Sequence, residues 1–597
     1  MCGIAGILSP GPAPAEGRRA LRSMQARLRH RGPDGEGEWV SPCGAAAFAH
    51  TRLAVFDRSK AGHQPMTIED GRYAITYNGA IYNFAEIRQA LARAGVGFTT
   101  NSDTEVILRL YQREGAAGMS RLRGMFAFAL WDAAARTCLL ARDRFGIKPL
   151  YYALDGGRLI FASEVRAVLA SDLVSRDLDP AGLYGLFRTG SVPEPTTIVR
   201  AIRAVPAAHV VQWHEGRISA QRYWQLRFTA DVEGDATALV RQRLADSVEH
   251  HFAGDAPAGL LLSGGVDSSA LLALARAGGR RGIKTFSLAL PSLPVDEGPA
   301  ARRTARRFDA VHHECAMDAA SARTAFTRYC TAIDQPTADG LNSYVMTQFA
   351  RQHGVTVLLS GIGGDELFGG YPTFRGVPRL AAWHRRFDWT GALAARVGRL
   401  AEAAAPEARS RRLADMLTRP PSLDNAYQAY RGFFTHVEST ALATHYAGGS
   451  AGPFELPADD APADADAGDT VSRLELSRYV RHQLLRDADV MGMAWGVEIR
   501  TPFLDPLLVD AVSRVPATAR LAPRKALLTA AVPELPGWVD PRIKRGFHLP
   551  FERWIDGEWQ DVFASVSSCP VATDTWYRKW LVHSVESWML KNQAGHA

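Results

Sequence analysis

The sequence predicts two domains, an α+β unit followed by an α/β unit, and two observations predict them. Early in the 597-residue chain, short strand-forming runs are closed by turn residues and separated by segments with helical periodicity. Strand pairs with helices at their margins are typical of an α+β layered unit. Later, continuous apolar runs alternate with long helical segments, which is typical of a doubly wound parallel sheet covered on both faces. We therefore expect a first domain at 1–210 and a second at 235–597, joined by a stretch at 205–235.

The elements of the first domain follow from local patterns. The run 74–77 is a strand that closes on Asn78-Gly79, a pair that favours tight turns. Other runs are rich in β-forming residues, and apolar residues that recur with the helical period fill the gaps between them. Strands are expected at 125–132, 137–143 and 159–162, and helices at 84–94 and 103–114.

The second domain takes its predicted strands from apolar runs at 260–262, 285–288 and 355–359, and a helix through Leu274 follows the first of them. In such sheets ligands bind at the carboxyl ends of the strands, so the residues that follow each strand are the functional candidates. The Pro/Ala/Asp-rich stretch 451–470 has little to bury, and we expect an exposed loop there.

Composition excludes several classes of protein. The 69 basic and 62 acidic side chains give a net charge of +7, but the arginines are scattered and form no basic arm, so we expect no nucleic-acid partner. No apolar run reaches the length of a membrane span, and we expect no membrane partner. Six cysteines lie far apart without metal-ligand spacing, which favours free thiols in a reducing, cytoplasmic compartment. The sequence is compatible with a homodimer and does not decide the oligomeric state.

Two glycine-rich turns follow predicted strands, and each leads into a helix. A turn of this kind points backbone N–H groups and the positive end of the helix dipole at one spot. Hydroxyls and carboxylates beside it suit a Mg²⁺-bound pyrophosphate, because Mg²⁺ takes one or two carboxylates plus phosphate oxygens. Two such turns at the strand ends of one sheet predict a nucleotide site. The turns are Ser263-Gly264-Gly265-Val266-Asp267-Ser268-Ser269 and Ser360-Gly361-Ile362-Gly363-Gly364-Asp365-Glu366.

Cys2 is the candidate nucleophile of the first domain. Removal of Met1 would place its thiol beside an α-amine with a pKa of about 8, which can act as a base. Arg52 can clamp a carboxylate, Asp103 can hold an ammonium group, and Asn78 with the Gly79 N–H can form an oxyanion hole. These groups are what hydrolysis of the side-chain amide of glutamine requires.

Over essentially its whole length, the chain resembles the glutamine-hydrolysing asparagine synthetase family. The resemblance rests on segments in the family's order in both halves. They are Met1-Cys2-Gly3-Ile4-Ala5-Gly6, His30-Arg31-Gly32-Pro33-Asp34, Tyr77-Asn78-Gly79-Ala80-Ile81-Tyr82-Asn83, Arg142-Asp143-Arg144-Phe145-Gly146 and Ser263–Ser269.

The resemblance implies an αββα N-terminal-nucleophile glutaminase joined to a pyrophosphate-releasing, adenylating domain. Cys2 would attack glutamine, Arg52 and Asp103 would bind it, and Asn78 and Gly79 would stabilise the oxyanion. Ammonia would pass through an internal tunnel to a carboxylate, aspartate in the family, activated by ATP. Lys525 would stabilise charge on the reacting phosphorus, and Asp267 and Asp365 would hold Mg²⁺. The remaining ATP contacts implied are Leu262, Ser263, Gly264, Gly265, Ser268, Leu288, Ser360 and Gly361.

Two positions depart from the family pattern. Ile362 stands where asparagine-forming members carry Glu, and an aliphatic side chain can neither polarise nor deprotonate a reacting group. Ala80 replaces a Glu after Asn-Gly, which would weaken the grip on the ammonium group of glutamine unless Asp103 suffices.

Four functions remain open on the sequence. The first is asparagine formation, and the second is the same chemistry on a peptide, polyketide or sugar acid. The third is ATP-dependent ring closure, as in β-lactam synthetases; the intact set Cys2, Arg52, Asn78 and Asp103 argues against it. The fourth, a tRNA-modifying ATPase or RNA-binding protein, lacks a basic stripe interleaved with aromatic residues.

Overall fold

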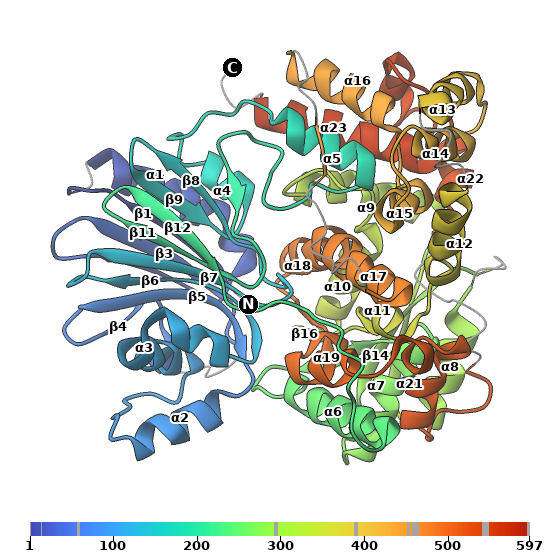
Figure 1. Ribbon diagram of the computed structural model, residues 1–597. Helices are drawn as coiled ribbons and strands as arrows, with labels where there is room; N and C mark the ends of the chain where they lie inside the picture. The colour runs from blue at the N-terminus through green and yellow to red at the C-terminus, as the bar shows by residue number, and fades with distance from the viewer. Residues whose placement is uncertain are drawn as a thin grey trace.

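The structure, a computed structural model, describes residues 2–12, 15–55, 60–291, 296–386, 392–449, 454–456, 465–539 and 549–593. Figure 1 shows two halves side by side, the N-terminal half of stacked strands and the C-terminal half dominated by helices. This arrangement confirms the predicted fold class: an α+β unit and an α/β unit with a parallel sheet.

The N-terminal half is built on two six-stranded antiparallel sheets. The first has the order β10-β8-β9-β1-β3-β2 and the second the order β12-β11-β7-β6-β5-β4. The strands of the first are β1 (Gly3–Leu8), β2 (Gly35–Val40), β3 (Ala46–Arg52), β8 (Tyr151–Asp155), β9 (Arg158–Ala162) and β10 (Arg203–Ala204). Those of the second are β4 (Met66–Ile68), β5 (Tyr73–Ile81), β6 (Gly124–Asp132), β7 (Thr137–Arg142), β11 (His209–His214) and β12 (Arg217–Arg222).

Strand alternation creates the αββα layers. On β1, Ile4 and Leu8 pack into the core between the sheets, whereas Ala5 and Ile7 pack outward against helix α1 (Ala15–Arg27). This is the period of two expected when both faces of a strand are buried. The outer face of the second sheet packs on α2 (Phe84–Arg93) and α3 (Asp103–Glu114), where the sequence predicts helices.

Two predictions for this half are wrong. Asn78 and Gly79 form no turn; they lie within β5 and pair with Ala127 and Phe126 of β6. Close approach explains the glycine, since a Cβ at position 79 would lie 2.3 Å from the carbonyl oxygen of Met125. The stretch 205–235 is also not a plain joining segment, because the β11–β12 hairpin within it pairs with β7. We propose that the first domain extends to about Arg222.

The C-terminal half contains a five-stranded parallel sheet of order β15-β14-β13-β16-β17. Its strands are β13 (Ala258–Leu261), β14 (Lys284–Ala289), β15 (Val311–Ala316), β16 (Val357–Leu359) and β17 (Glu498–Arg500). The sequence predicts β13, β14 and β16 but not the two edge strands. Both lack an apolar run: β15 is a partly exposed His-rich segment, and β17 buries the charged pair Glu498–Arg500.

Helices cover both faces of this sheet. Leu260 and Leu359 pack on one face and Leu261 and Leu358 on the other, so successive residues serve opposite helical layers. The helices of the whole C-terminal half, including those at the end away from the sheet, are α6 (Ala236–His251), α7 (Val266–Ala277), α8 (Gly298–Arg307), α9 (Ala319–Ala332), α10 (Leu341–Gln352), α11 (Gly364–Phe368), α12 (Thr373–Arg385), α13 (Ala392–Ala404), α14 (Ala408–Leu417), α15 (Leu423–Arg431), α16 (His436–Ala447), α17 (Ala467–Leu474), a π-helix (Glu475–Leu485), α18 (Arg486–Met493), α19 (Pro506–Ser513), α20 (Ala517–Arg520), α21 (Ala526–Ala531), α22 (Phe551–Asp556) and α23 (Trp576–Gln593).

Most of the predicted loop at 451–470 lies outside the described residues. Its end is described: the carboxylate of Asp466 caps α17 by accepting the N–H groups of Gly468 and Asp469, so the last residues of the stretch are helical.

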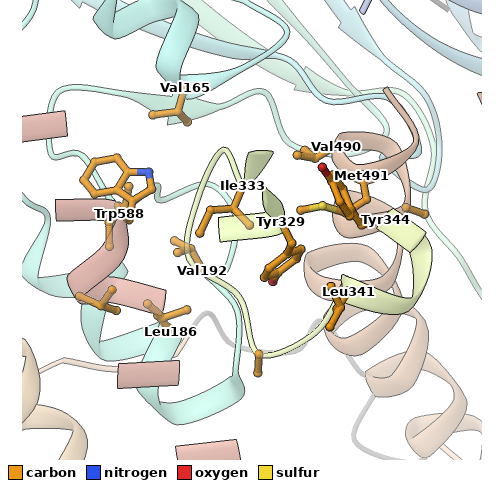
Figure 2. Close-up of a cluster of buried hydrophobic side chains, with 14 of the residues drawn as sticks. Val165, Leu186, Val192, Tyr329, Ile333, Leu341, Tyr344, Val490, Met491 and Trp588 are labelled. Atoms are coloured by element: carbon orange, nitrogen blue, oxygen red, sulfur yellow. The ribbon is translucent and has the colours of Figure 1, made fainter. Parts of the chain in front are cut away.

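The hydrophobic cores are shared between the halves. Figure 2 shows Val165, Leu186 and Val192 of the N-terminal half in one cluster with Tyr329 and Trp588 of the C-terminal half. A second cluster joins residues such as Leu53 and Tyr82 to the helices beneath the parallel sheet. This shared packing fixes the position of one half against the other.

Candidate functional site

Cys2 lies at the start of β1, 8% exposed, between the two sheets of the N-terminal half. Its backbone N–H donates to Asn78 Oδ1 at 2.9 Å, and its Sγ lies 4.0 Å from the carbonyl oxygen of Leu53. Gly3 pairs with Thr51, which places Arg52 next to Cys2 across the strand pair. Burial raises the pKa of the Cys2 thiol, so the thiol needs a base before it can act as a nucleophile.

The amide nitrogen of the Asn78 side chain is available as a hydrogen-bond donor. Its Oδ1 is engaged by Cys2, but its buried Nδ2 has no hydrogen-bond partner among the described residues. A buried unpaired amide N–H is costly unless a ligand satisfies it. Nδ2 therefore has the properties that an oxyanion contact requires.

Asp103 is anchored to the strand that carries Asn78. Its Oδ2 accepts from the Tyr77 hydroxyl at 2.8 Å and from the Ile81 N–H at 3.2 Å. Burial raises the pKa of this carboxyl group, and the hydrogen bonds oppose the rise. Cys2 and Arg52 of the first sheet thus lie beside Asn78 of the second, and Asp103 at the start of α3 bonds to the strand that carries Asn78; this arrangement is compatible with the predicted glutamine site.

We expect that Asn78→Ala lowers glutaminase kcat by about 10² to 10³, the usual cost of one lost oxyanion donor. The measurement is glutamate release from glutamine, with amide formation from added ammonia as the control. A loss of both activities would mean that Asn78 only supports the fold.

The second site is a cavity of about 730 Å³ at the carboxyl edge of the parallel sheet. Both glycine-rich turns line it, as predicted. The predicted residues on its wall are Ser263, Gly265, Asp267, Ser268, Ser360, Gly361, Asp365 and Lys525. Gly264, at φ +71°, packs instead against α8, where a Cβ would lie 2.8 Å from the backbone nitrogen of Ala301.

Leu262 and Leu288 are buried, 0% and 3% exposed, and do not belong to the residues that line this cavity. The neighbouring Leu261 does line it. Contact of Leu262 and Leu288 with an adenine ring therefore stays a prediction.

Lys525 joins the two predicted metal ligands. Its Nζ lies 2.6 Å from both carboxylate oxygens of Asp267 and 2.6 Å from Oδ1 of Asp365. Lys525 itself has a left-handed backbone (φ +51°), which aims the start of α21. A Cβ on Gly364 would collide with the Asp267 carboxylate at 2.6 Å, so a bare backbone is required there.

The two carboxylates suit Mg²⁺, which binds through one or two carboxylates and the oxygens of a bound phosphate. Within the described part of the chain, no group of three or more His, Cys, Asp or Glu side chains could hold a metal ion. The two carboxylates alone fit the number of protein ligands that Mg²⁺ takes beside a nucleotide.

Sequence reasoning missed Glu366 as a cavity residue, although it is the last residue of the second glycine-rich turn. Glu366 is 1% exposed, lines the cavity and accepts a hydrogen bond from the Tyr371 hydroxyl at 2.9 Å. Burial, together with the nearby Glu475, raises its pKa to about 7. Ile362 also lines the cavity and packs against both large hydrophobic clusters.

Arg31 links the Cys2 segment to the C-terminal half. Its Nε donates to the carbonyl oxygen of Cys2 at 3.1 Å, and its Nη2 donates to Asp489 of the C-terminal half at 2.7 Å. Glu164 pairs with the same guanidinium at 2.9 Å, and Lys148 reaches Asp489 at 3.4 Å. Sequence motifs place Arg31 in the first domain but do not reveal this contact across 458 residues.

Known proteins resemble both halves. Residues 1–224 match the family described as glutamine amidotransferase domain, and residues 239–582 match the asparagine synthase family. Asparagine synthetase (glutamine-hydrolysing) 1 of Bacillus subtilis is 30% identical over 94% of this chain and 89% of that protein. A putative asparagine synthetase (glutamine-hydrolysing) of Mycobacterium tuberculosis is 32% identical over 95% of this chain and 91% of that protein. The amidase chry2 of Gibberella zeae is 29% identical over 63% of this chain and 60% of that protein.

The fold and the matches define a glutamine amidotransferase fused to an ATP-using carbon–nitrogen ligase. The chain belongs to the asparagine synthase family of glutamine-hydrolysing enzymes. Across the described residues, no helix is long and apolar enough to cross a membrane.

Proposed function

We propose that this protein transfers the amide nitrogen of glutamine to a carboxylate that it first activates with ATP. The observation that carries the proposal is Arg31, which contacts the Cys2 carbonyl on one side and the synthetase half on the other. A residue shared in this way joins the Cys2 segment to the half of the molecule that contains the proposed nucleotide cavity.

At the first site, the Cys2 thiol attacks the side-chain amide carbon of glutamine. Its proton passes to the α-amine and on to the leaving ammonia, and a glutamyl thioester remains for water to hydrolyse. Asn78 Nδ2 and the Gly79 N–H stabilise the oxyanion, Arg52 holds the carboxylate of glutamine, and Asp103 holds its ammonium group. The buried position of Cys2 keeps bulk water from the leaving ammonia.

At the second site, an oxygen of the acceptor carboxylate attacks the α-phosphorus of ATP and pyrophosphate leaves. Ammonia then attacks the acyl carbon and AMP leaves. Asp267 and Asp365 would hold Mg²⁺, which supplies charge neutralisation on the pyrophosphate. Lys525 binds the phosphate charge that develops during adenylation, and the turn of Ser263 to Ser268 binds pyrophosphate through backbone N–H groups.

We further propose that Glu366 takes up the proton that ammonia loses when the amide forms. It is a carboxylate inside the cavity and its partner Tyr371 keeps it oriented. Glu366→Gln is expected to slow amide formation by about 10² to 10⁴ while pyrophosphate exchange into ATP continues. Single-turnover assays with ammonia separate the two steps. Equal loss of exchange and amide formation would instead make Glu366 a nucleotide-binding residue.

Ile362 bears on the identity of the acceptor carboxylate. Aspartate is the family's substrate, but Ile362 presents an aliphatic side chain to the cavity where asparagine-forming members carry Glu. This observation favours the second candidate, a carboxylate other than free aspartate.

We expect that Ile362→Glu raises aspartate-dependent pyrophosphate release, because a carboxylate there can bind the amino group of aspartate or polarise incoming ammonia. Ile362→Gln, of similar size and without charge, is the matched control. Equal rates for both variants would show that the missing carboxylate does not set acceptor choice.

Pyrophosphate release tests the function directly. We expect release that depends on ATP and a carboxylate, and amide formation that depends on glutamine or ammonia. The assay uses aspartate beside sugar, peptide and polyketide acids. Glutaminase activity that no acceptor stimulates, with no pyrophosphate from any acid, would contradict the proposed ligase.

A further inference from the structure

The cavity extends beyond the nucleotide turns. Its far wall comes from α14, α15 and α23, helices that lie together at one end of the C-terminal half (Figure 1). Arg412 of α14 lines this end, with Phe433, Trp576 and Tyr577. None of these four residues belongs to the nucleotide turns, so this end of the cavity can take another part of the reactants.

Arg412 is unusual among the buried cations of this protein. Nine arginines of the described residues are buried below 9% exposure, and eight of them have a carboxylate within 4.0 Å. Arg412, 8% exposed, is the ninth, and no described carboxylate lies within 4.0 Å of it. Burying a cation without a counter-charge is costly, and a bound anion would remove that cost.

Neutral acceptors hold the Arg412 guanidinium in place. Its Nε donates to the Ala429 carbonyl oxygen at 3.3 Å, and its Nη1 donates to the Tyr577 hydroxyl at 3.2 Å and to the Phe433 carbonyl oxygen at 3.5 Å. These contacts orient the group but supply no negative charge, and within the described residues Nη2 makes no hydrogen bond. A planar guanidinium held in this way suits the oxygens of a phosphate or carboxylate.

The walls around Arg412 are aromatic. Phe433 and Tyr577 meet edge to face at 5.2 Å between ring centroids, and Trp576 lies 5.3 Å from Phe551. Aromatic faces in a pocket favour a ring with apolar faces, and hydroxyl and amide groups beside them fix its orientation. Free aspartate has no ring that could pack against these walls.

We propose that Arg412 and this aromatic wall form a subsite for a second anionic group on the acceptor. The acceptor is then a ring-bearing carboxylic acid with an additional phosphate or carboxylate, of the chemical class of a phosphorylated sugar acid. The carboxylate to be adenylated lies toward Lys525, and the second anion lies on Arg412. The proposal rests on the proposed function, because it takes the nucleotide end of the cavity to be the adenylation site.

The test is calorimetric titration of the full chain, loaded with an unreactive ATP analogue, using glucuronic acid 1-phosphate and methyl glucuronoside. Both carry the same ring and carboxylate, but only the first carries a second anion. We expect the phosphate-bearing acid to bind at least about ten-fold tighter, the usual effect of one charged hydrogen-bond pair. Arg412→Met is expected to erase this difference, and Arg412→Lys to keep part of it.

Arg409→Met is the matched control, because Arg409 is an exposed arginine of the same helix. Equal affinity of the wild type for both acids, or an equal loss for both in Arg412→Met, overturns the subsite. Pyrophosphate release with the same acids is measured in parallel. Arg412-dependent binding without any pyrophosphate release would keep the subsite and overturn the proposed ligase reaction, so the two failures are distinguishable.

Discussion

Replacement of Cys2 by alanine is expected to abolish glutamine-dependent amide formation and to leave ammonia-dependent formation within about two-fold of the wild type. The thiol is the only group proposed to bond covalently to glutamine, so its loss removes the whole ammonia supply. The synthetase cavity contains none of the atoms that change. Glutamate release and amide formation are measured on one preparation.

Cys2→Ala removes only the Sγ atom, so the expected loss of activity can be assigned to the thiol rather than to a disturbed fold. Cys2 is 8% exposed and contacts Asn78 through its backbone, which alanine retains. Cys2→Ser is a useful second variant, since it keeps the shape of the side chain and lowers its nucleophilicity. Loss of the ammonia-dependent reaction in both variants would contradict the scheme of two separate reaction centres.

Asp267→Asn is expected to give the opposite dissociation: pyrophosphate release falls by about 10² or more, while glutamate release from glutamine persists. The carboxylate is proposed to bind Mg²⁺ and contacts Lys525 at 2.6 Å. The amide conserves its shape but removes the charge, so Lys525 shifts toward Asp365 and the pyrophosphate loses a metal contact.

Pyrophosphate release at saturating ATP and ammonia is the measurement, and Cys2→Ala serves as the reciprocal control because it should keep this activity. A normal rate of pyrophosphate release in Asp267→Asn would exclude Asp267 from the nucleotide site. Loss of glutaminase activity as well would place its role in the packing between the halves.

Local patterns predict much of this molecule because they have local causes. Alternating and continuous apolar runs identify β6, β7, β13 and β14, and helical periodicity identifies α2, α3 and α7. The glycine-rich turns identify the position of the cavity at the sheet edge because chain geometry forces glycine where a backbone approaches another group closely, as at Gly364.

The features that local patterns do not predict depend on contacts between segments that lie far apart in the sequence. Asn78-Gly79 has the local sequence of a turn, but pairing with β6 holds it in a strand. Glu366 and Arg412 acquire their properties from burial and from neighbours on other helices. No period or motif in the sequence encodes the absence, among the described residues, of a carboxylate within 4.0 Å of Arg412.

The shared hydrophobic clusters have a consequence for how the chain folds during synthesis. The N-terminal half emerges from the ribosome first, with residues such as Leu53 and Tyr82 still lacking the helices that bury them. Val165 of this half packs in one cluster with Val490 and Trp588, which are made 325 and 423 residues later. We expect the nascent first half to depend on chaperones until the last helix has been made, and the mature protein to unfold as one cooperative unit.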